Sequence, residues 1–121
     1  MKRTLSALAA TAIAAAAFVV IAPFAGANTA RTTAATIHVQ ARDTLRFALD
    51  KKKAPHGKTI FKVKNVGRTS HDFWIAGKKT KLLGHNQTAT LTVTLKKGKH
   101  PYKCTVPGHA AAGMKGVFRS T

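Results

Sequence analysis

The residues most able to do chemistry lie close together near the end of the chain. The only cysteine, Cys104, is followed at the spacing C-x4-H-x4-M by His109 and Met114. Another histidine, His71, lies 33 residues before the cysteine. Two imidazoles, a thiolate and a weak thioether form the ligand set of a mononuclear type 1 copper site. Zinc remains an alternative for two histidines and a cysteine, although a thioether is a poor zinc ligand.

The first 27 residues have the features of a secretory signal. Lys2 and Arg3 precede an uncharged, Ala-rich apolar stretch over 5–22, which Pro23 ends. Ala25-Gly26-Ala27 then offers the small residues that signal peptidase requires, so we expect cleavage after Ala27. An uncleaved single-span anchor is the alternative, because the apolar run is close to the minimum spanning length. Either way, we expect the rest of the chain to work in the periplasm, outside the cell or at the cell surface.

Export makes the single cysteine informative. One cysteine forms no disulfide within the chain, and an unpaired thiol is a liability in an oxidising compartment. An odd cysteine in an exported protein indicates either an intermolecular bridge or a thiol with a task. Because Cys104 lies within the histidine and methionine pattern, we favour the task of binding a metal.

The elements that must position these residues are short strands. After a small, polar leader over 28–35, hydrophobic residues alternate with polar ones, and Gly-, Pro- and Lys-rich turns intervene. This period of two predicts about seven strands, over 36–41, 44–49, about 61–65, 71–75, 88–95, 99–104 and 116–119. The segment 51–57 is expected to be a charged loop. The pattern predicts one all-β domain over 36–121, a single antiparallel Greek-key sandwich or barrel.

These motifs together resemble the cupredoxins, the small blue copper proteins, over roughly residues 36–121. The resemblance rests on Asn65-Val66-Gly67 before His71, on Gly98 before Tyr102-Lys103-Cys104, and on the ending Pro-Gly-His-Ala-x-x-Gly-Met-x-Gly. The loop from cysteine to methionine is longer than in plastocyanin and resembles that of rusticyanin. The resemblance implies one copper ion, with His71, Cys104 and His109 as equatorial ligands and Met114 as the axial ligand. It also implies that Asn65, Asp72 and Tyr102 support these ligands.

The chain departs from the familiar family pattern at Asp72. Plastocyanins and azurins carry asparagine after the first histidine ligand, where its side chain ties the two ligand loops together. A carboxylate still accepts backbone N–H bonds, but it adds negative charge near the metal. We therefore expect an ionised Asp72 to favour Cu(II) and lower the reduction potential. A surface turn residue is the alternative interpretation of Asp72.

The resemblance also indicates where a partner would dock. By analogy, His109 reaches the surface through an unusually apolar loop, which contains Pro107, Gly108, Ala110 and Ala111. Lys103 and Lys115 flank this loop in the sequence and are expected to form a charged rim.

Charge restricts the range of partners. The chain has 21 Lys and Arg residues against 3 acidic ones, a formal charge of +18, which becomes +16 without Lys2 and Arg3. This charge favours acidic redox proteins of the cytochrome or oxidase type, or an anionic cell surface. Nucleic acid is not expected, because the lysines are dispersed and the aromatic residues are too few for a stacking platform. We expect a monomer.

The residue inventory favours a carrier over an enzyme. The chain has no glutamate and few groups for general acid–base catalysis, and it lacks the His-x-His pairs of a multicopper oxidase. A soluble one-electron carrier is the favoured function, and an extracytoplasmic copper-binding or delivery protein is the alternative. The remaining histidines are expected to be solvated, although a second, weaker metal site among them stays open: His38, His56, His85 and His100.

Overall fold

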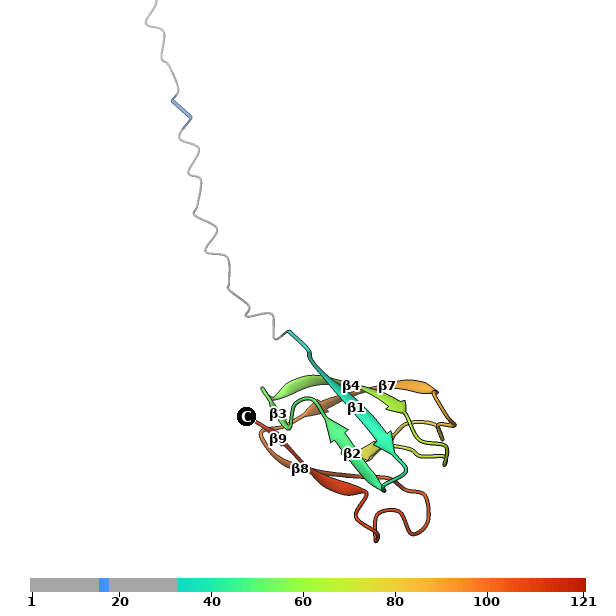
Figure 1. Ribbon diagram of the computed structural model, residues 1–121. Helices are drawn as coiled ribbons and strands as arrows, with labels where there is room; N and C mark the ends of the chain where they lie inside the picture. The colour runs from blue at the N-terminus through green and yellow to red at the C-terminus, as the bar shows by residue number, and fades with distance from the viewer. Residues whose placement is uncertain (1–15, 18–32) are drawn as a thin grey trace, which may run out of the picture.

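The computed structural model describes residues 16–17 and 33–121, and it shows two β-sheets packed face to face (Figure 1). The described residues form nine strands: β1 (Ala35–Arg42), β2 (Arg46–Leu49), β3 (Lys53–Ala54), β4 (Gly57–Asn65), β5 (Trp74–Ile75), β6 (Lys78–Lys79), β7 (Thr88–Leu95), β8 (Gly98–Lys103) and β9 (Lys115–Ser120). None of the described residues belongs to a helix that could cross a membrane. Apart from residues 16–17, the predicted signal lies outside the described residues, as does most of the predicted leader, so both stay predictions.

The β-sandwich predicted from the sequence is confirmed. The first sheet has the order β2-β1-β4-β7 and the second has the order β3-β9-β8-β5-β6. Among the described residues neither sheet closes on itself, so the fold is an open sandwich rather than the closed barrel that the pattern also allowed.

Not every strand pair is antiparallel, which corrects the sequence-based description. β1 pairs with β4 in parallel, and β3 pairs with β9 in parallel, while the other pairs are antiparallel. Between β1 and β4 the chain forms β2 and then crosses to β3 in the other sheet. Such a crossover returns the chain in its original direction. Alternation of hydrophobic residues shows which face is buried, but it does not show the direction of the neighbouring strand.

Two short stretches also differ from the prediction. The expected strand over 71–75 is reduced to β5, with His71 forming an isolated bridge to Leu83, and the expected loop over 51–57 contains β3. β3 is only two residues long, which is too short for a period of two to reveal.

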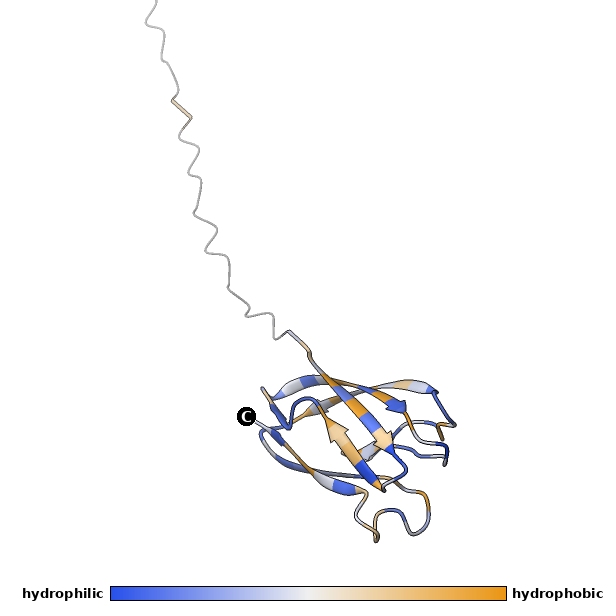
Figure 2. Cartoon of the chain, viewed as in Figure 1, coloured by the Kyte–Doolittle hydropathy of each residue, from blue (hydrophilic) through white to orange (hydrophobic). Residues whose placement is uncertain are grey.

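Hydrophobic residues of both sheets form the core, and Figure 2 shows the resulting alternation along the strands. Ile37, Val39, Phe61 and Val63 of the first sheet face inward and are at most 1% exposed. Aromatic rings fill the middle: the Phe61 and Phe73 centroids lie 5.2 Å apart, and Phe73 stacks on Tyr102 at 5.5 Å. Aromatic pairs at such distances add to the stability gained by burial alone. The sandwich is therefore a well-packed support for the loops at its ends.

The strand register brings four connecting segments to one end of the sandwich. Ala41 of β1 lies opposite Asn65 of β4, so the turn after β1 and the loop after β4 leave the sheet together. Lys64 lies opposite Thr88, which brings the segment before β7 to the same end. In the second sheet, Lys103 lies opposite Lys115, so the segment 104–114 connects β8 and β9 as one long loop.

Candidate metal centre

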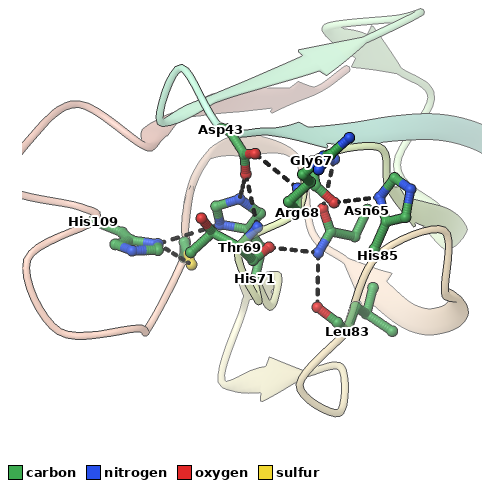
Figure 3. A network of polar contacts seen from close by, with 10 residues as sticks. Asp43, Asn65, Gly67, Arg68, Thr69, His71, Leu83, His85 and His109 are labelled. Carbon is green, nitrogen blue, oxygen red and sulfur yellow. Dashed lines mark hydrogen bonds and ion pairs between the residues drawn. The ribbon is translucent and has the colours of Figure 1, made fainter.

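Three side chains from two of these segments converge at this end. His71 Nδ1 lies 3.2 Å from His109 Nδ1, and Cys104 Sγ lies 3.6 Å from the same nitrogen (Figure 3). All three atoms lie within 4.8 Å of one another. Metal bonds of about 2.0 Å to nitrogen and about 2.3 Å to sulfur in a trigonal plane place the ligand atoms about 3.5–3.7 Å apart. The donor atoms and their spacing therefore fit a single metal ion.

Met114 closes the loop that carries two of these side chains. Its side chain is fully buried in a small apolar cluster with Ala41 and Cys104. The Cys104 N–H donates to the Met114 carbonyl at 3.0 Å, and the Met114 N–H donates to the His109 carbonyl at 3.0 Å. These bonds fix both ends of the loop, so the cysteine, histidine and methionine are held as one unit.

Backbone pairing holds His71 against the sheets. The His71 N–H donates to Leu83 O at 3.0 Å, and the Leu83 N–H donates to His71 O at 2.7 Å. His71 is fully buried. A residue held at both backbone groups and covered by protein has little freedom to reorient, which suits a metal ligand.

Asn65 connects the two segments around His71. Its side-chain amide donates to Thr69 O at 2.7 Å and to Leu83 O at 2.8 Å, while its Oδ1 accepts from the Gly67 N–H at 2.9 Å. Asn65 is fully buried, and every one of these bonds satisfies a polar group. The side chain therefore determines the path of the loop that leads into His71.

Asp72 connects the His71 segment to the Cys104 loop. It is only 6% exposed, its Oδ1 accepts from the Thr105 N–H at 2.6 Å, and its Oδ2 accepts from the Thr105 hydroxyl. The surface-turn interpretation therefore does not describe its surroundings. A buried carboxylate next to the cysteine loop is placed to act electrostatically on the metal.

The thiol of Cys104 has a mixed environment. Burial raises the pKa of Cys104, and the negative charge of Asp72 adds to this effect, whereas backbone N–H groups of Asp72 and Val106 lower the pKa. Without a metal the thiol is therefore the favoured form, and a metal ion supplies the positive charge that a buried thiolate requires.

Tyr102 belongs to the core rather than to the metal-facing side chains. It is 7% exposed and stacks on Phe73, and burial raises the pKa of its phenol. Because Tyr102 lies two residues before Cys104, its packing sets the position from which the cysteine loop starts.

The loop over 104–114 is open to solvent on its outer side. Pro107, Gly108 and Ala111 are exposed, and Ala110 and His109 are half-buried. Lys103 and Lys115 are exposed next to the loop, and Lys103 Nζ lies 5.1 Å from the centroid of the Trp74 ring. The predicted apolar patch and its charged rim are thus accessible to another molecule.

In the described part of the chain, three of the four other histidines contact backbone oxygens through their rings. His56 lies 2.8 Å from Thr121 O, His85 lies 2.8 Å from Gly67 O, and His100 lies 2.7 Å from Lys96 O. His38 is exposed. Among the described residues, His71, Cys104 and His109 form the one group of three side chains that could hold a metal.

One residue near the site was missed from the sequence. Asp43 lies in the turn between β1 and β2, and its Oδ1 lies 3.2 Å from His71 Nε2. Hydrogen bonds from the Arg68 and Thr69 N–H groups, followed by the contact with His71, lower the pKa of Asp43 to about 2. No spacing motif marks this residue; the only signal was that it is one of three acidic residues in the chain.

Comparison with known proteins gives a consistent result. Residues 26–119 match the family model for copper binding proteins of the plastocyanin/azurin family. No curated protein matches the sequence.

Solved structures with the same fold include two auracyanins and an azurin. A dithionite-reduced auracyanin from the photosynthetic bacterium Roseiflexus castenholzii is 26% identical, with a TM-score of 0.63, covering 73% of this chain and 98% of its own. Auracyanin A, a "blue" copper protein from Chloroflexus aurantiacus, is 21% identical, with a TM-score of 0.60, covering 71% of this chain and 98% of its own. An azurin from Methylomonas sp. strain J is 14% identical, with a TM-score of 0.62 and coverages of 72% and 98%.

Proposed function

Because the chain belongs to the plastocyanin/azurin family of copper-binding proteins and binds one copper ion, we propose that it is an exported one-electron carrier. The observation that carries this proposal is the convergence of His71 Nδ1, Cys104 Sγ and His109 Nδ1 within 4.8 Å on a rigid sandwich. When bound, copper supplies one-electron chemistry by alternating between Cu(II) and Cu(I).

The three converging atoms are the proposed equatorial ligands, and Met114 is the proposed axial ligand. Thiolate and thioether stabilise Cu(I), and the two imidazoles accept either oxidation state. The hydrogen bonds of Asn65 and Asp72 keep the ligand segments in one arrangement. A site that changes little between oxidation states suits electron transfer, whereas catalysis requires room for a substrate.

The route for the electron passes through His109. His109 is half-buried, in a loop whose residues Pro107, Gly108 and Ala111 are exposed. We propose that a redox partner covers this loop, with Lys103 and Lys115 attracting acidic groups at its rim. The formal charge of +16 that remains without Lys2 and Arg3 supports acidic redox proteins or an anionic cell surface as partners, and a monomer as the working form.

Export rests on the sequence of residues 1–27, with cleavage proposed after Ala27. The mass of the protein recovered from outside the cytoplasm tests this part separately. Recovery of a chain that begins at Asn28 supports it, and a full-length chain retained in the membrane contradicts cleavage.

A redox cycle in the presence of a Cu(I) chelator tests carrier against delivery. The copper-loaded protein is reduced, mixed with an oxidised acidic cytochrome, and analysed for cytochrome reduction and for copper in the chelator. A carrier reduces the cytochrome and keeps its copper over repeated cycles. Transfer of copper to the chelator without cytochrome reduction would favour delivery.

A further inference from the structure

Asp43 contacts the side of the His71 ring that faces away from the convergent site. Its Oδ1 lies 3.2 Å from Nε2, while Nδ1 of the same ring lies 3.2 Å from His109 Nδ1 (Figure 3). The two nitrogens of His71 are therefore divided between two partners. A carboxylate only accepts hydrogen bonds, so Nε2 carries the proton and the lone pair of Nδ1 is directed at the site.

The carboxylate is itself fixed in place. Its Oδ2 accepts from the Arg68 N–H at 2.7 Å, and its Oδ1 accepts from the Thr69 N–H at 3.0 Å. Gly67 packs so closely against Asp43 that a β-carbon at position 67 would overlap the carboxylate. Although the Asp43 side chain is 44% exposed, these contacts leave it one orientation, with an oxygen at the His71 ring.

The fold explains why a residue of the β1–β2 turn reaches a ring 28 residues further along. β1 and β4 are parallel, and Ala41 lies opposite Asn65, so the turn with Asp43 and the loop 66–70 leave the sheet side by side. The contact consequently depends on the parallel pairing, and it connects the first sheet directly to the metal centre.

The distribution of acidic groups is also unusual for so basic a chain. Of the three acidic residues, Asp43 contacts His71, and Asp72 holds the loop after Cys104. Only Asp50 lies elsewhere, where its Oδ1 accepts from the His38 N–H at 2.8 Å. Two negative charges are thus placed against proposed ligand segments.

We propose that Asp43 is a positioning residue for the copper centre: it fixes the tautomer and orientation of His71 and stabilises Cu(II) relative to Cu(I). This inference rests on the proposed function, since it requires His71 to bind copper through Nδ1. A carboxylate that accepts from the remote N–H of a ligand histidine raises the basicity of that ligand. The effect is larger for the ion of higher charge, so loss of the carboxylate raises the reduction potential.

Asp43→Asn tests the proposal, and Asp50→Asn is its matched control. Asparagine keeps one oxygen, which can still accept from the Thr69 N–H and lie at the His71 ring, but it loses the charge and the oxygen that accepts from the Arg68 N–H. Asp50→Asn removes the same charge from a residue that also accepts a backbone N–H but does not contact the centre. For each copper-loaded protein, the Cu(II) and Cu(I) affinities are measured by competition with chelators, and the potential by redox titration.

We expect Asp43→Asn to lower the Cu(II) affinity about 10- to 100-fold. The Cu(I) affinity falls less, the potential rises, and Asp50→Asn matches the wild type. Equal potentials for the two variants would overturn the proposal, because the effect would then be one of overall charge. If the wild type itself binds no copper, the proposed function fails as well, which separates the two failures.

A second measurement needs no variant. In the wild-type Cu(I) protein, the proton on His71 Nε2 is expected to resonate far downfield in the proton NMR spectrum and to exchange slowly with water, as a charge-assisted hydrogen bond requires. A rapidly exchanging proton at an ordinary shift would contradict the contact with Asp43, even if Asp43→Asn failed to fold.

Discussion

Asp72 has the most direct electrostatic influence on the cysteine. Replacing it by asparagine keeps an acceptor for the Thr105 N–H and supplies a donor for the Thr105 hydroxyl, but removes the charge. We expect Asp72→Asn to raise the reduction potential, because the lost negative charge stabilised Cu(II) more than Cu(I). Redox titration beside Asp50→Asn checks this, and an unchanged or lower potential would contradict it.

The proposed ligands were predictable from the sequence because their types and spacing are rare in combination. Cys104, His109 and Met114 lie in one loop, so their proximity follows from the sequence alone. His71 lies far from that loop in the sequence, and its assignment was supported by the resemblance, which rests partly on Asn65-Val66-Gly67 before it. Asp43 escaped prediction because it reaches the site only through the parallel pairing of β1 and β4, which hydrophobic alternation does not reveal.

At the scale of the elements, Asn65 holds together the loops around His71. Asn65→Ala removes three side-chain hydrogen bonds and leaves the buried Leu83 carbonyl with one fewer partner. Each unsatisfied buried group costs about 1–3 kcal/mol, so we expect a loss of about 2–4 kcal/mol in the free energy of unfolding. Urea denaturation of the metal-free protein measures it.

The control for this prediction is Gln40→Ala, which removes an exposed amide from β1. We expect a change of about 0.5 kcal/mol or less for this surface substitution. Similar losses for the two variants would show that Asn65 contributes no more than a surface residue.

The exposed loop after Cys104 is the proposed contact for a redox partner. Ala111→Glu adds a charge in the middle of this apolar surface, whereas Thr92→Glu adds the same charge to an exposed position of β7. Since acidic partners repel the new charge where they dock, we expect Ala111→Glu to slow electron transfer to an acidic cytochrome about tenfold or more. Stopped-flow kinetics compares the variants, and equal rates would place the contact elsewhere.

Among the elements, the long strands were predicted well. The alternation in Thr88–Leu95 identifies β7, and its Leu91, Val93 and Leu95 are buried as expected. β3 and β6 were not predicted, because two-residue strands depend on their neighbours for pairing rather than on their own pattern.

At the scale of the whole molecule, positive charge dominates. Lys103 and Lys115 next to the loop over 104–114 are not the only group of positive charges. A cleft of about 760 Å³ is lined by cationic residues and one apolar side chain: Lys51, Lys52, Lys53, Lys99, Val117 and Arg119. In the register of the second sheet, Arg119 of β9 lies opposite Lys53 of β3 on one side and opposite Lys99 of β8 on the other. Three positive charges are therefore adjacent across three strands. Such an arrangement is destabilising on its own and strengthens the attraction of anions.

We expect electron transfer to an acidic cytochrome to slow steeply with salt. The length over which salt screens charges falls from about 30 Å at an ionic strength of 0.01 M to about 8 Å at 0.15 M. Electrostatic steering raises the rate of association between oppositely charged proteins by about 10- to 1,000-fold. The double variant Lys103→Gln/Lys115→Gln is expected to have a lower rate of electron transfer at low salt than the double variant Lys51→Gln/Lys52→Gln, because Lys103 and Lys115 flank the loop over 104–114. Stopped-flow rates at several ionic strengths measure both effects, and a rate independent of salt would contradict steering.

The visible absorption spectrum of the Cu(II)-loaded protein tests the central claim, that Cys104 binds copper together with His71 and His109. We predict an intense band at about 600 nm from the copper–thiolate bond, which bleaches on reduction, returns on oxidation and is absent in Cys104→Ser. A colourless Cu(II) protein, or a band that survives in Cys104→Ser, would contradict the assignment of the cysteine as a ligand.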